Sequence, residues 1–218
     1  MSKKNLLSLL VAVVVALFAF QYAAASAIYV QTTPLGATQI PGLVGSTVID
    51  FESTTPGTYT TLTLSGVTFT PDSGKLMWVD GAYIGQYNNF GSQSLHNNYD
   101  PQSFNILTIN FNGITSGFGF FWGASDTQWA LTAYDSSNNP IESFALPITT
   151  SSSAGDFVGL LDPGIAWVTL AGTGTDYVFV DNFEFNPTGT ATPEPGSLLL
   201  VGSGVLGLAG VIRRKPSL

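Results

Sequence analysis

The sequence predicts an all-β fold: an antiparallel β-sandwich or jelly roll between an N-terminal signal helix and a C-terminal transmembrane helix. Three observations predict it. Between residues 46 and 187, short apolar runs alternate with polar residues at period two. Clusters of Gly, Pro, Asn, Asp and Ser separate these runs about every eight to twelve residues. No part of this region shows a sustained apolar period of 3.6 residues, so we expect helix only at the two ends.

The first 27 residues are typical of a cleavable signal peptide. Lys3 and Lys4 precede an apolar stretch over residues 6–20, and Ala25 and Ala27 supply the small side chains that signal peptidase requires. We therefore expect cleavage after Ala27; the alternative is a retained anchor, for which the stretch is short. Residues 28–45 contain Pro and Gly and are expected to form a loose N-terminal arm.

The β-sandwich is expected over residues 46–187. Its predicted strands are 47–52, 59–64, 66–70, 75–80, 82–87, 104–111, 116–122, 128–135, 141–147, 156–161, 165–170 and 177–185. The clearest alternation is in the last of these, which predicts one face made of Tyr177, Phe179, Phe183 and Phe185. Trp122 and Trp129 fall in phase with other apolar faces and are expected in the core.

The C-terminal segment has three parts after an uncharged linker at residues 188–192. These are the box Pro193, Glu194 and Pro195, an uncharged run over residues 197–212, and the basic cluster Arg213, Arg214 and Lys215. As a helix the run would cover about 24 Å, slightly less than a hydrocarbon core of about 30 Å, and bilayer thinning with snorkelling of the Arg side chains can close the difference. The basic cluster should stay cytoplasmic, which leaves the domain outside the cell.

These three parts, in this order, resemble the PEP-CTERM sorting signal over residues 192–218. The resemblance implies recognition of the box by an exosortase in the inner membrane, removal of the tail, and delivery to the cell surface or biofilm matrix of a Gram-negative bacterium that makes exopolysaccharide. The alternative is an ordinary single-span anchor that is never processed.

The region between the two ends is similar to the β-sandwich ectodomains that often precede this tail. The similarity rests on Val48-Ile49-Asp50-Phe51-Glu52, Phe121-Trp122-Gly123, Ala133-Tyr134-Asp135 and Val180-Asp181-Asn182-Phe183. Such ectodomains resemble galactose-binding-type jelly rolls and carbohydrate-binding modules, so the similarity implies a jelly-roll-like sandwich.

The charge distribution excludes one class of partner. Between residues 28 and 192 the chain has thirteen acidic residues against the single lysine Lys75, a net charge of about −12. Nucleic acid is not expected as a partner, since its affinity for proteins rests on Lys and Arg that neutralise phosphates. The chain has no cysteine, which excludes disulfides, thiolate zinc sites and a cysteine nucleophile.

Asp181 is the first candidate for a metal site. Strict alternation places it beside Phe179 and Phe183 on an apolar face, where an unpaired carboxylate costs several kcal/mol. If the first and last strands pair, Asp50 or Glu52 could join Asp181 in holding a structural Ca²⁺, which takes six to eight oxygen ligands. The alternative is a β-bulge at Asp181-Asn182 that turns the carboxylate to solvent or to backbone amides.

A glycan contact is the second candidate. Trp78, Tyr83 and Tyr87 lie in a region rich in Asn, Gln and Ser, and aromatic faces with neighbouring amides suit sugars. The alternative is packing beneath a long loop. His96, the only histidine, is expected in a solvated loop, because proximity to Asp100 in sequence does not make a Ser-His-Asp site.

Three functions follow from these features. The chain is expected to be a structural or adhesive protein of the surface or matrix and not an enzyme, with extracellular polysaccharide as a candidate partner. A carbohydrate-binding module working through Trp78, Tyr83 and Tyr87 is the alternative. A hydrolase of extracellular polymer is the third reading, and no motif selects a pair of catalytic carboxylates for it.

Overall fold

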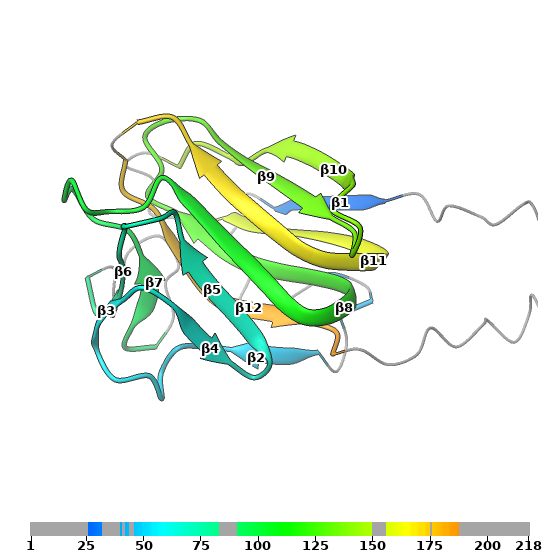
Figure 1. The fold of residues 1–218 in the computed structure, drawn as a ribbon, viewed down its shortest axis with the longest axis horizontal. Helices are drawn as coiled ribbons and strands as arrows, with labels where there is room; N and C mark the ends of the chain where they lie inside the picture. Colours follow the sequence, from blue (N-terminus) through cyan, green and yellow to red (C-terminus); the bar gives the residue numbers. More distant parts are fainter. Residues whose placement is uncertain are drawn as a thin grey trace, which may run out of the picture.

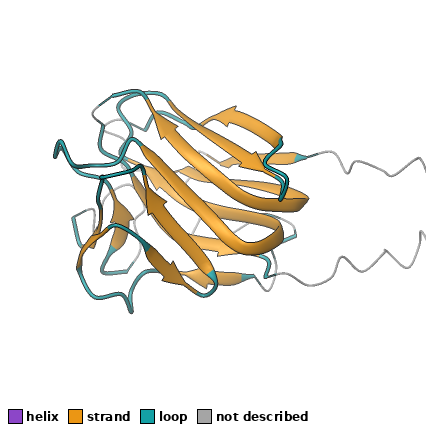
Figure 2. Ribbon diagram, viewed as in Figure 1, coloured by secondary structure: helices purple, strands orange, loops and turns teal. Residues whose placement is uncertain are grey.

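The computed structural model describes residues 26–31, 40, 42–43, 46–82, 91–149, 156–174 and 176–187. These residues form only strands and loops, as Figure 2 shows, and the two terminal helices expected from the sequence lie outside them. Among the described residues, no helix has the length and hydropathy needed to cross a membrane.

The described residues form twelve strands, and all the pairings among these strands are antiparallel. They are β1 (Ala27–Gln31), β2 (Thr47–Ile49), β3 (Gly57–Tyr59), β4 (Leu62–Leu64), β5 (Val67–Pro71), β6 (Met77–Asp80), β7 (Ser94–His96), β8 (Ile106–Gly123), β9 (Trp129–Tyr134), β10 (Pro140–Ala145), β11 (Asp156–Gly172) and β12 (Phe179–Phe185).

Two long bent strands, β8 and β11, connect the two layers of a sandwich (Figure 1). Their segments 106–110 and 167–172 lie in what we call the front sheet, with strand order β4-β5-β8-β11-β9-β10. Their other segments, 117–123 and 156–161, lie in the back sheet, ordered β1-β11-β8-β12-β7-β6-β3, with β2 also paired to β12. The predicted antiparallel β-sandwich is confirmed.

The main core fills the space between the sheets. It contains Trp122 and Trp129, in T-shaped contact at 5.6 Å, as the phase of their strands predicted. Phe183 from β12 stacks near both Phe118 and Phe120 of β8, with ring centroids 6.0 and 5.9 Å away. Alternation along each strand produces this core, because every second side chain points inward.

The expected single face of β12 is interrupted. The pairing of β12 with β8 shifts register between Asp181 and Glu184, and Asn182 has a positive φ of 43°. This is the β-bulge at Asp181-Asn182 that was the alternative for Asp181. Because the bulge inserts one residue, Phe183 lies in the main core while Phe179 lies on the opposite side of the sheet. The prediction that Tyr177 and Phe179 share a face with Phe183 is therefore wrong.

A second, smaller cluster covers the outer side of the back sheet. Phe121, Phe157 and Phe179 project from three neighbouring strands, and the buried side chains of Ile40 and Leu43 pack against them. The segment expected as a loose arm over residues 28–45 thus contributes buried residues. It also contributes β1, which pairs with β11 from Ala27 to Gln31.

Other strand boundaries also differ from those expected. The predicted pairs 104–111 with 116–122, and 156–161 with 165–170, are each one continuous bent strand, so Asp162-Pro163-Gly164 lies at a bend and does not end the strand. The three-residue strand β7 was not predicted, and most of the expected strand 82–87 lies outside the described residues.

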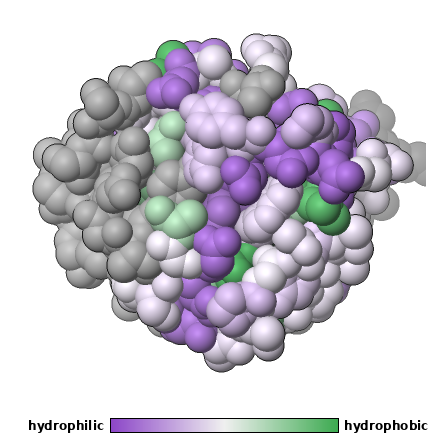
Figure 3. Space-filling view, turned by 90° about the vertical axis from the view of Figure 1, so that its left-hand side faces the viewer, coloured by the Kyte–Doolittle hydropathy of each residue, from purple (hydrophilic) through white to green (hydrophobic). Residues whose placement is uncertain are grey.

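Both ends of the domain lie at one pole. Ala27 of β1 is paired with Leu161, which is paired with Gly117, and the amide of Asn186 donates to the Gly117 carbonyl. We call this the basal pole; it is at the right of Figure 1. The opposite, distal pole is seen in Figure 3, where hydrophilic side chains form a band across the face.

Candidate functional site

The distal pole brings several polar side chains together, among them His96. Strand pairing places Trp78 of β6 opposite His96 of β7, and Asp80 opposite Ser94. His96 is in turn opposite Phe179 of β12. These short strands therefore carry one histidine and one carboxylate to adjacent positions on the outer side of the back sheet.

His96 is buried, with 1% of its surface exposed. Its Nε2 lies 2.8 Å from Asp80 Oδ1, and its Nδ1 lies 2.6 Å from the carbonyl oxygen of Asn97. Both ring nitrogens of His96 therefore have a polar partner within hydrogen-bond distance. The prediction of a solvated loop histidine is wrong, because the strand pairing of β7 with β6 and β12 buries the ring.

Two tyrosines extend this cluster toward solvent. The Tyr177 ring stacks over His96 at 6.3 Å and contacts the Tyr99 ring at 4.6 Å, while Tyr99 is 59% exposed. Burial, together with the negative charge of Asp80, raises the pKa of Tyr177 above its usual value. Among the described residues of this pole, Tyr99 therefore presents an exposed aromatic ring.

Asp176 holds the loops of this pole together. Its Oδ1 accepts from the backbone amides of Asp126 and Tyr177 at 2.9 and 2.7 Å. Its Oδ2 accepts from the Thr127 amide, the Thr127 hydroxyl and the Trp129 indole at 3.1, 2.8 and 2.8 Å. A carboxylate that is 2% exposed is satisfied here by five donors. No sequence pattern marked Asp176 for this position.

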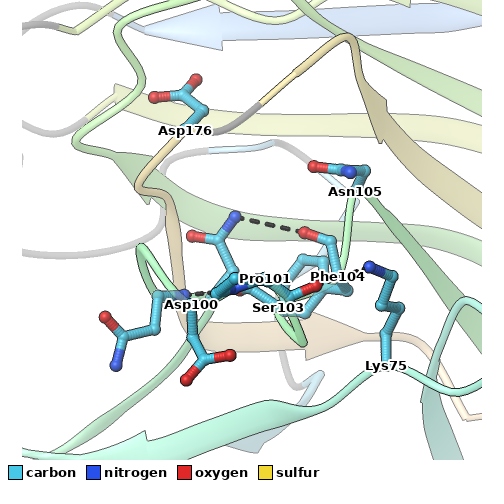
Figure 4. A pocket seen from close by; sticks show the side chains of 9 residues that line it. Lys75, Asp100, Pro101, Ser103, Phe104, Asn105 and Asp176 are labelled. Atoms are coloured by element: carbon cyan, nitrogen blue, oxygen red, sulfur yellow. Dashed lines mark hydrogen bonds between the residues drawn. The ribbon is translucent and has the colours of Figure 1, made fainter.

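A cavity of about 50 Å³ lies beside Asp176 (Figure 4). Lys75 lines it and donates from Nζ to the Pro101 carbonyl at 2.7 Å, while Asn97 donates to the Phe104 carbonyl at 3.3 Å. A space of this size is large enough for a water molecule and far below the roughly 300 Å³ of small-ligand sites.

The three residues proposed for calcium are not brought together. Glu52 reaches away to residues 91–93, where its carboxylate accepts from the hydroxyl and amide of Ser92 and from the Gln93 amide. Asp50 accepts from the Glu52 amide, and Asp181 is fully buried and accepts from the Asn182 amide at 2.7 Å. Among the described residues, no three His, Asp or Glu side chains are grouped to hold a metal ion. The expected pairing of β2 with β12 is nonetheless present.

The three residues proposed for glycan contact are only partly placed. Trp78 is half-buried on β6, whereas Tyr83 and Tyr87 lie outside the described residues. Ala27 begins β1, whereas the other signal residue, Ala25, lies outside the described residues. The same holds for the sorting residues Pro193, Glu194, Pro195, Arg213, Arg214 and Lys215.

The described geometry of the distal pole favours a structural role for its charged groups. Both His96 nitrogens are engaged, so neither is available as a general base for a nearby hydroxyl. Asp176 is saturated with donors. These groups order the loops that carry Tyr99 and Tyr177.

Comparison with solved structures finds partial similarity at low sequence identity. The K1 cleaved adhesin domain of Lys-gingipain from Porphyromonas gingivalis W83 is 13% identical, with a TM-score of 0.44 over 66% of this chain and 99% of that one. TmCBM61, solved with β-1,4-galactotriose, is 14% identical. Its TM-score is 0.32, and the match covers 57% of this chain and 90% of that one. A carbohydrate-binding module of family 29 is 11% identical. Its TM-score is 0.29, and the match covers 79% of this chain and 99% of that one. At these scores none of them bears on what this chain binds.

Comparison of the sequence gives one result at the C-terminus. No curated protein matches the chain. Residues 191–215 match the family model described as the PEP-CTERM protein-sorting motif. The chain therefore carries a PEP-CTERM sorting motif immediately after its β-sandwich.

Proposed function

We propose that this chain is an exported surface or matrix protein, released from the inner membrane by an exosortase, whose β-sandwich serves as a non-catalytic adhesive domain. The observation that carries the proposal is the sorting motif at residues 191–215, which begins six residues after β12 ends at Phe185. The expected signal peptide at the other end supports the same route.

The arrangement of the domain agrees with this route. Both ends of the sandwich lie at the basal pole, since Ala27 and Asn186 are joined to the same corner of β8 and β11. The distal pole then lies at the opposite end of the domain from Ala27 and Asn186. A domain oriented in this way can contact extracellular material both before and after its release.

The chemistry of the described residues supports adhesion over catalysis. Two cavities lined by described residues measure about 50 and 180 Å³, both smaller than common substrate pockets of at least about 300 Å³. Adhesion to a polymer requires an accessible face and does not require a pocket.

The test follows the full chain in a bacterium that has this sorting system, beside a strain that lacks its exosortase. One epitope is placed after Leu218, and an antibody detects the domain. We expect the wild-type chain to lose the C-terminal epitope and to reach the surface or medium. Replacing Pro193, Glu194 and Pro195 by Ala should keep the epitope and hold the chain in the membrane fraction.

The matched control replaces the linker residues Thr188 and Thr190 by Ala, which should leave processing unchanged. Retention of the epitope in the wild-type chain, with or without the exosortase, would show a permanent anchor and overturn the proposed route.

A further inference from the structure

The outer surface of the front sheet carries a straight row of hydroxyl groups. Direct cross-strand pairing runs from Thr70 of β5 to Thr108 of β8, Thr169 of β11, Thr132 of β9 and Ser143 of β10. Directly paired residues project from the same side of a sheet. The row therefore crosses five adjacent strands with one hydroxyl on each.

Burial confirms that this row faces solvent. Thr70 and Ser143 are exposed and the three central threonines are half-buried, whereas the neighbours of the central three along their strands lie in the main core. Thr132 and Ser143 are already in hydrogen-bond contact, with their hydroxyl oxygens 2.8 Å apart. Each hydroxyl can donate one hydrogen bond and accept others, so the row can still bind polar ligands.

An aromatic pair lies in the next row. Trp167 of β11 is directly paired with Asn110 on one side and Tyr134 on the other. The Trp167 and Tyr134 rings are stacked, with centroids 3.8 Å apart and planes 5° from parallel, and the Trp167 indole donates to Asn138 Oδ1 at 3.1 Å. The pair is held in place without being covered, since both residues are half-buried.

Neither row carries a charge at neutral pH, although the domain as a whole has thirteen acidic residues against one lysine. A basic partner would find its complement elsewhere on this acidic surface, and an anionic one would be repelled by the rest of the domain. Protein interfaces place aromatic and apolar residues at their centre, whereas here the centre is a line of hydroxyls. The face is suited to an uncharged ligand rich in hydroxyl groups.

The spacing of the row indicates the form of that ligand. Neighbouring strands lie about 4.8 Å apart, which is close to the advance of one pyranose unit along an extended β-1,4-linked chain. Such a polymer lying across the strands would meet one protein hydroxyl per sugar unit. The free face of Trp167 would be available to the C–H surface of a sugar.

We propose that the front sheet binds an extended, neutral β-1,4-linked polysaccharide across its strands, through the hydroxyl row and the Trp167–Tyr134 pair. The proposal rests on the proposed adhesive function and names its ligand and surface. It assigns binding to the front sheet, whereas Trp78 lies on β6 of the back sheet.

The test is affinity electrophoresis of the full chain in native gels with a non-glycosidic detergent. Hydroxyethylcellulose is the probe. Carboxymethylcellulose, with the same backbone but negative charges, tests neutrality, and dextran, with a different linkage, tests geometry. We expect retardation that rises with the concentration of hydroxyethylcellulose and is weak or absent in the other two gels.

Two variants assign the surface. Trp167→Ala and the combined change of Thr108, Thr132 and Thr169 to Val should each weaken binding at least about tenfold, given an expected two- to tenfold for each hydroxyl removed. The matched controls Trp78→Ala and Thr58→Val change the same residue types on β6 and β3 of the back sheet and should bind as wild type. Trp167→Phe keeps a stacked ring and should retain most of the binding, which separates loss of contact from loss of fold.

Several results would overturn the proposal. The first is that hydroxyethylcellulose causes no retardation, and the second is that carboxymethylcellulose or dextran retards the chain equally. A third such result is loss of binding in Trp78→Ala while Trp167→Ala still binds. The sorting assay with the Pro193, Glu194 and Pro195 variant is read independently, so failure to bind this polymer and failure of export are distinguished.

Discussion

The outer faces of the two sheets differ in what covers them. On the back sheet, Phe121, Phe157 and Phe179 are closed over by Ile40 and Leu43. On the front sheet, the corresponding outer positions carry threonines and the Trp167–Tyr134 pair, and they stay accessible to solvent. The outer face of the back sheet is covered by residues of the same chain, whereas the outer face of the front sheet is in contact with solvent.

Glycines explain how the back sheet is closed. A Cβ on Gly159 would lie 2.4 Å from the Phe118 carbonyl oxygen and 2.7 Å from Ile40 Cδ1, and one on Gly119 would lie 2.6 Å from the Phe157 ring. Only residues without a side chain let the covering segment approach the strands this closely. The cover over the back sheet therefore depends on glycines that allow close backbone contact as well as on apolar side chains.

The largest expected effect comes from removing a ring on the covered face. Phe157→Ala should lower the free energy of unfolding by about 3–5 kcal/mol, since the ring is 1% exposed and in T-shaped contact with Phe121. Trp167→Ala on the open face should cost only about 1–2 kcal/mol, mostly the stack on Tyr134. Urea denaturation of both variants measures the difference, and equal costs would show that the front face is also a packed one.

A smaller loss is expected at the close approach itself. Gly159→Ala should cost about 1–3 kcal/mol, because the added methyl group meets a backbone carbonyl that cannot move aside. Gly164→Ala is the matched control: its nearest neighbour would be Asp162 Oδ1 at 3.6 Å, an ordinary contact. Thermal unfolding of the two variants should separate them, and an unchanged melting temperature in Gly159→Ala would contradict the tight cover over β11.

Asp156 and Asp135 should change the stability of the fold with pH in opposite directions. Burial raises the pKa of Asp156, in the back sheet, from 3.8 to about 6. Because the folded pKa lies above the unfolded one, folding favours the protonated form of Asp156. This contribution to stability is complete below pH 3.8 and is lost as pH rises through about 6. Asp156→Asn should remove that slope between pH 4 and 7 in urea denaturation.

Asp135, at the exposed turn of the front sheet, shows the reverse. Hydrogen bonds from the Asn139 side chain and backbone lower its pKa below the usual value. Its contribution is therefore present above the unfolded pKa of 3.8 and lost as pH falls. A pH slope between 4 and 7 that survives in Asp156→Asn but disappears in Asp135→Asn would contradict this assignment.

The smallest effect belongs to the hydroxyl row. Thr132→Val should change the free energy of unfolding by no more than about 0.5 kcal/mol, because water can replace its contact with Ser143. Thr115→Val is the contrasting case: this buried hydroxyl donates to the carbonyls of Gly117 and Asn186, which would lose their partner at a cost of about 1–3 kcal/mol. Chemical denaturation should rank them in this order; a costly Thr132→Val would mean that the row is a structural feature.

The sequence predicted the β-sandwich and the two tryptophans of its core, because the alternation of apolar and polar residues is a local property of each strand. Trp122 and Trp129 each have apolar neighbours two positions away, and both are in the core. The face of Phe179 was predicted wrongly because one extra residue at the bulge reverses the phase. Asn182, a residue type that tolerates positive φ, was the available signal, whereas the alternative bulge at Asp181-Asn182 rested on the cost of a buried carboxylate.

The details of the candidate sites depend on contacts that are distant in sequence. His96 meets Asp80 only because β6 pairs with β7, and Ser94–His96 is too short a strand to show a period. The five donors on Asp176 come from a loop about fifty residues earlier and from Tyr177. The hydroxyl row likewise requires the register of five strands, which no single segment of the sequence contains.

The place of β12 in the back sheet has a mechanical consequence. This strand leads directly to the sorting tail, and it is flanked by β8 on one side and by β2 and β7 on the other. Tension applied through the tail while the domain is attached elsewhere would run along β12 and shear the hydrogen bonds on both of its edges at once. An edge strand in that place would instead unzip one bond at a time. A domain built in this way should hold its shape under pulling while it remains tethered to the cell.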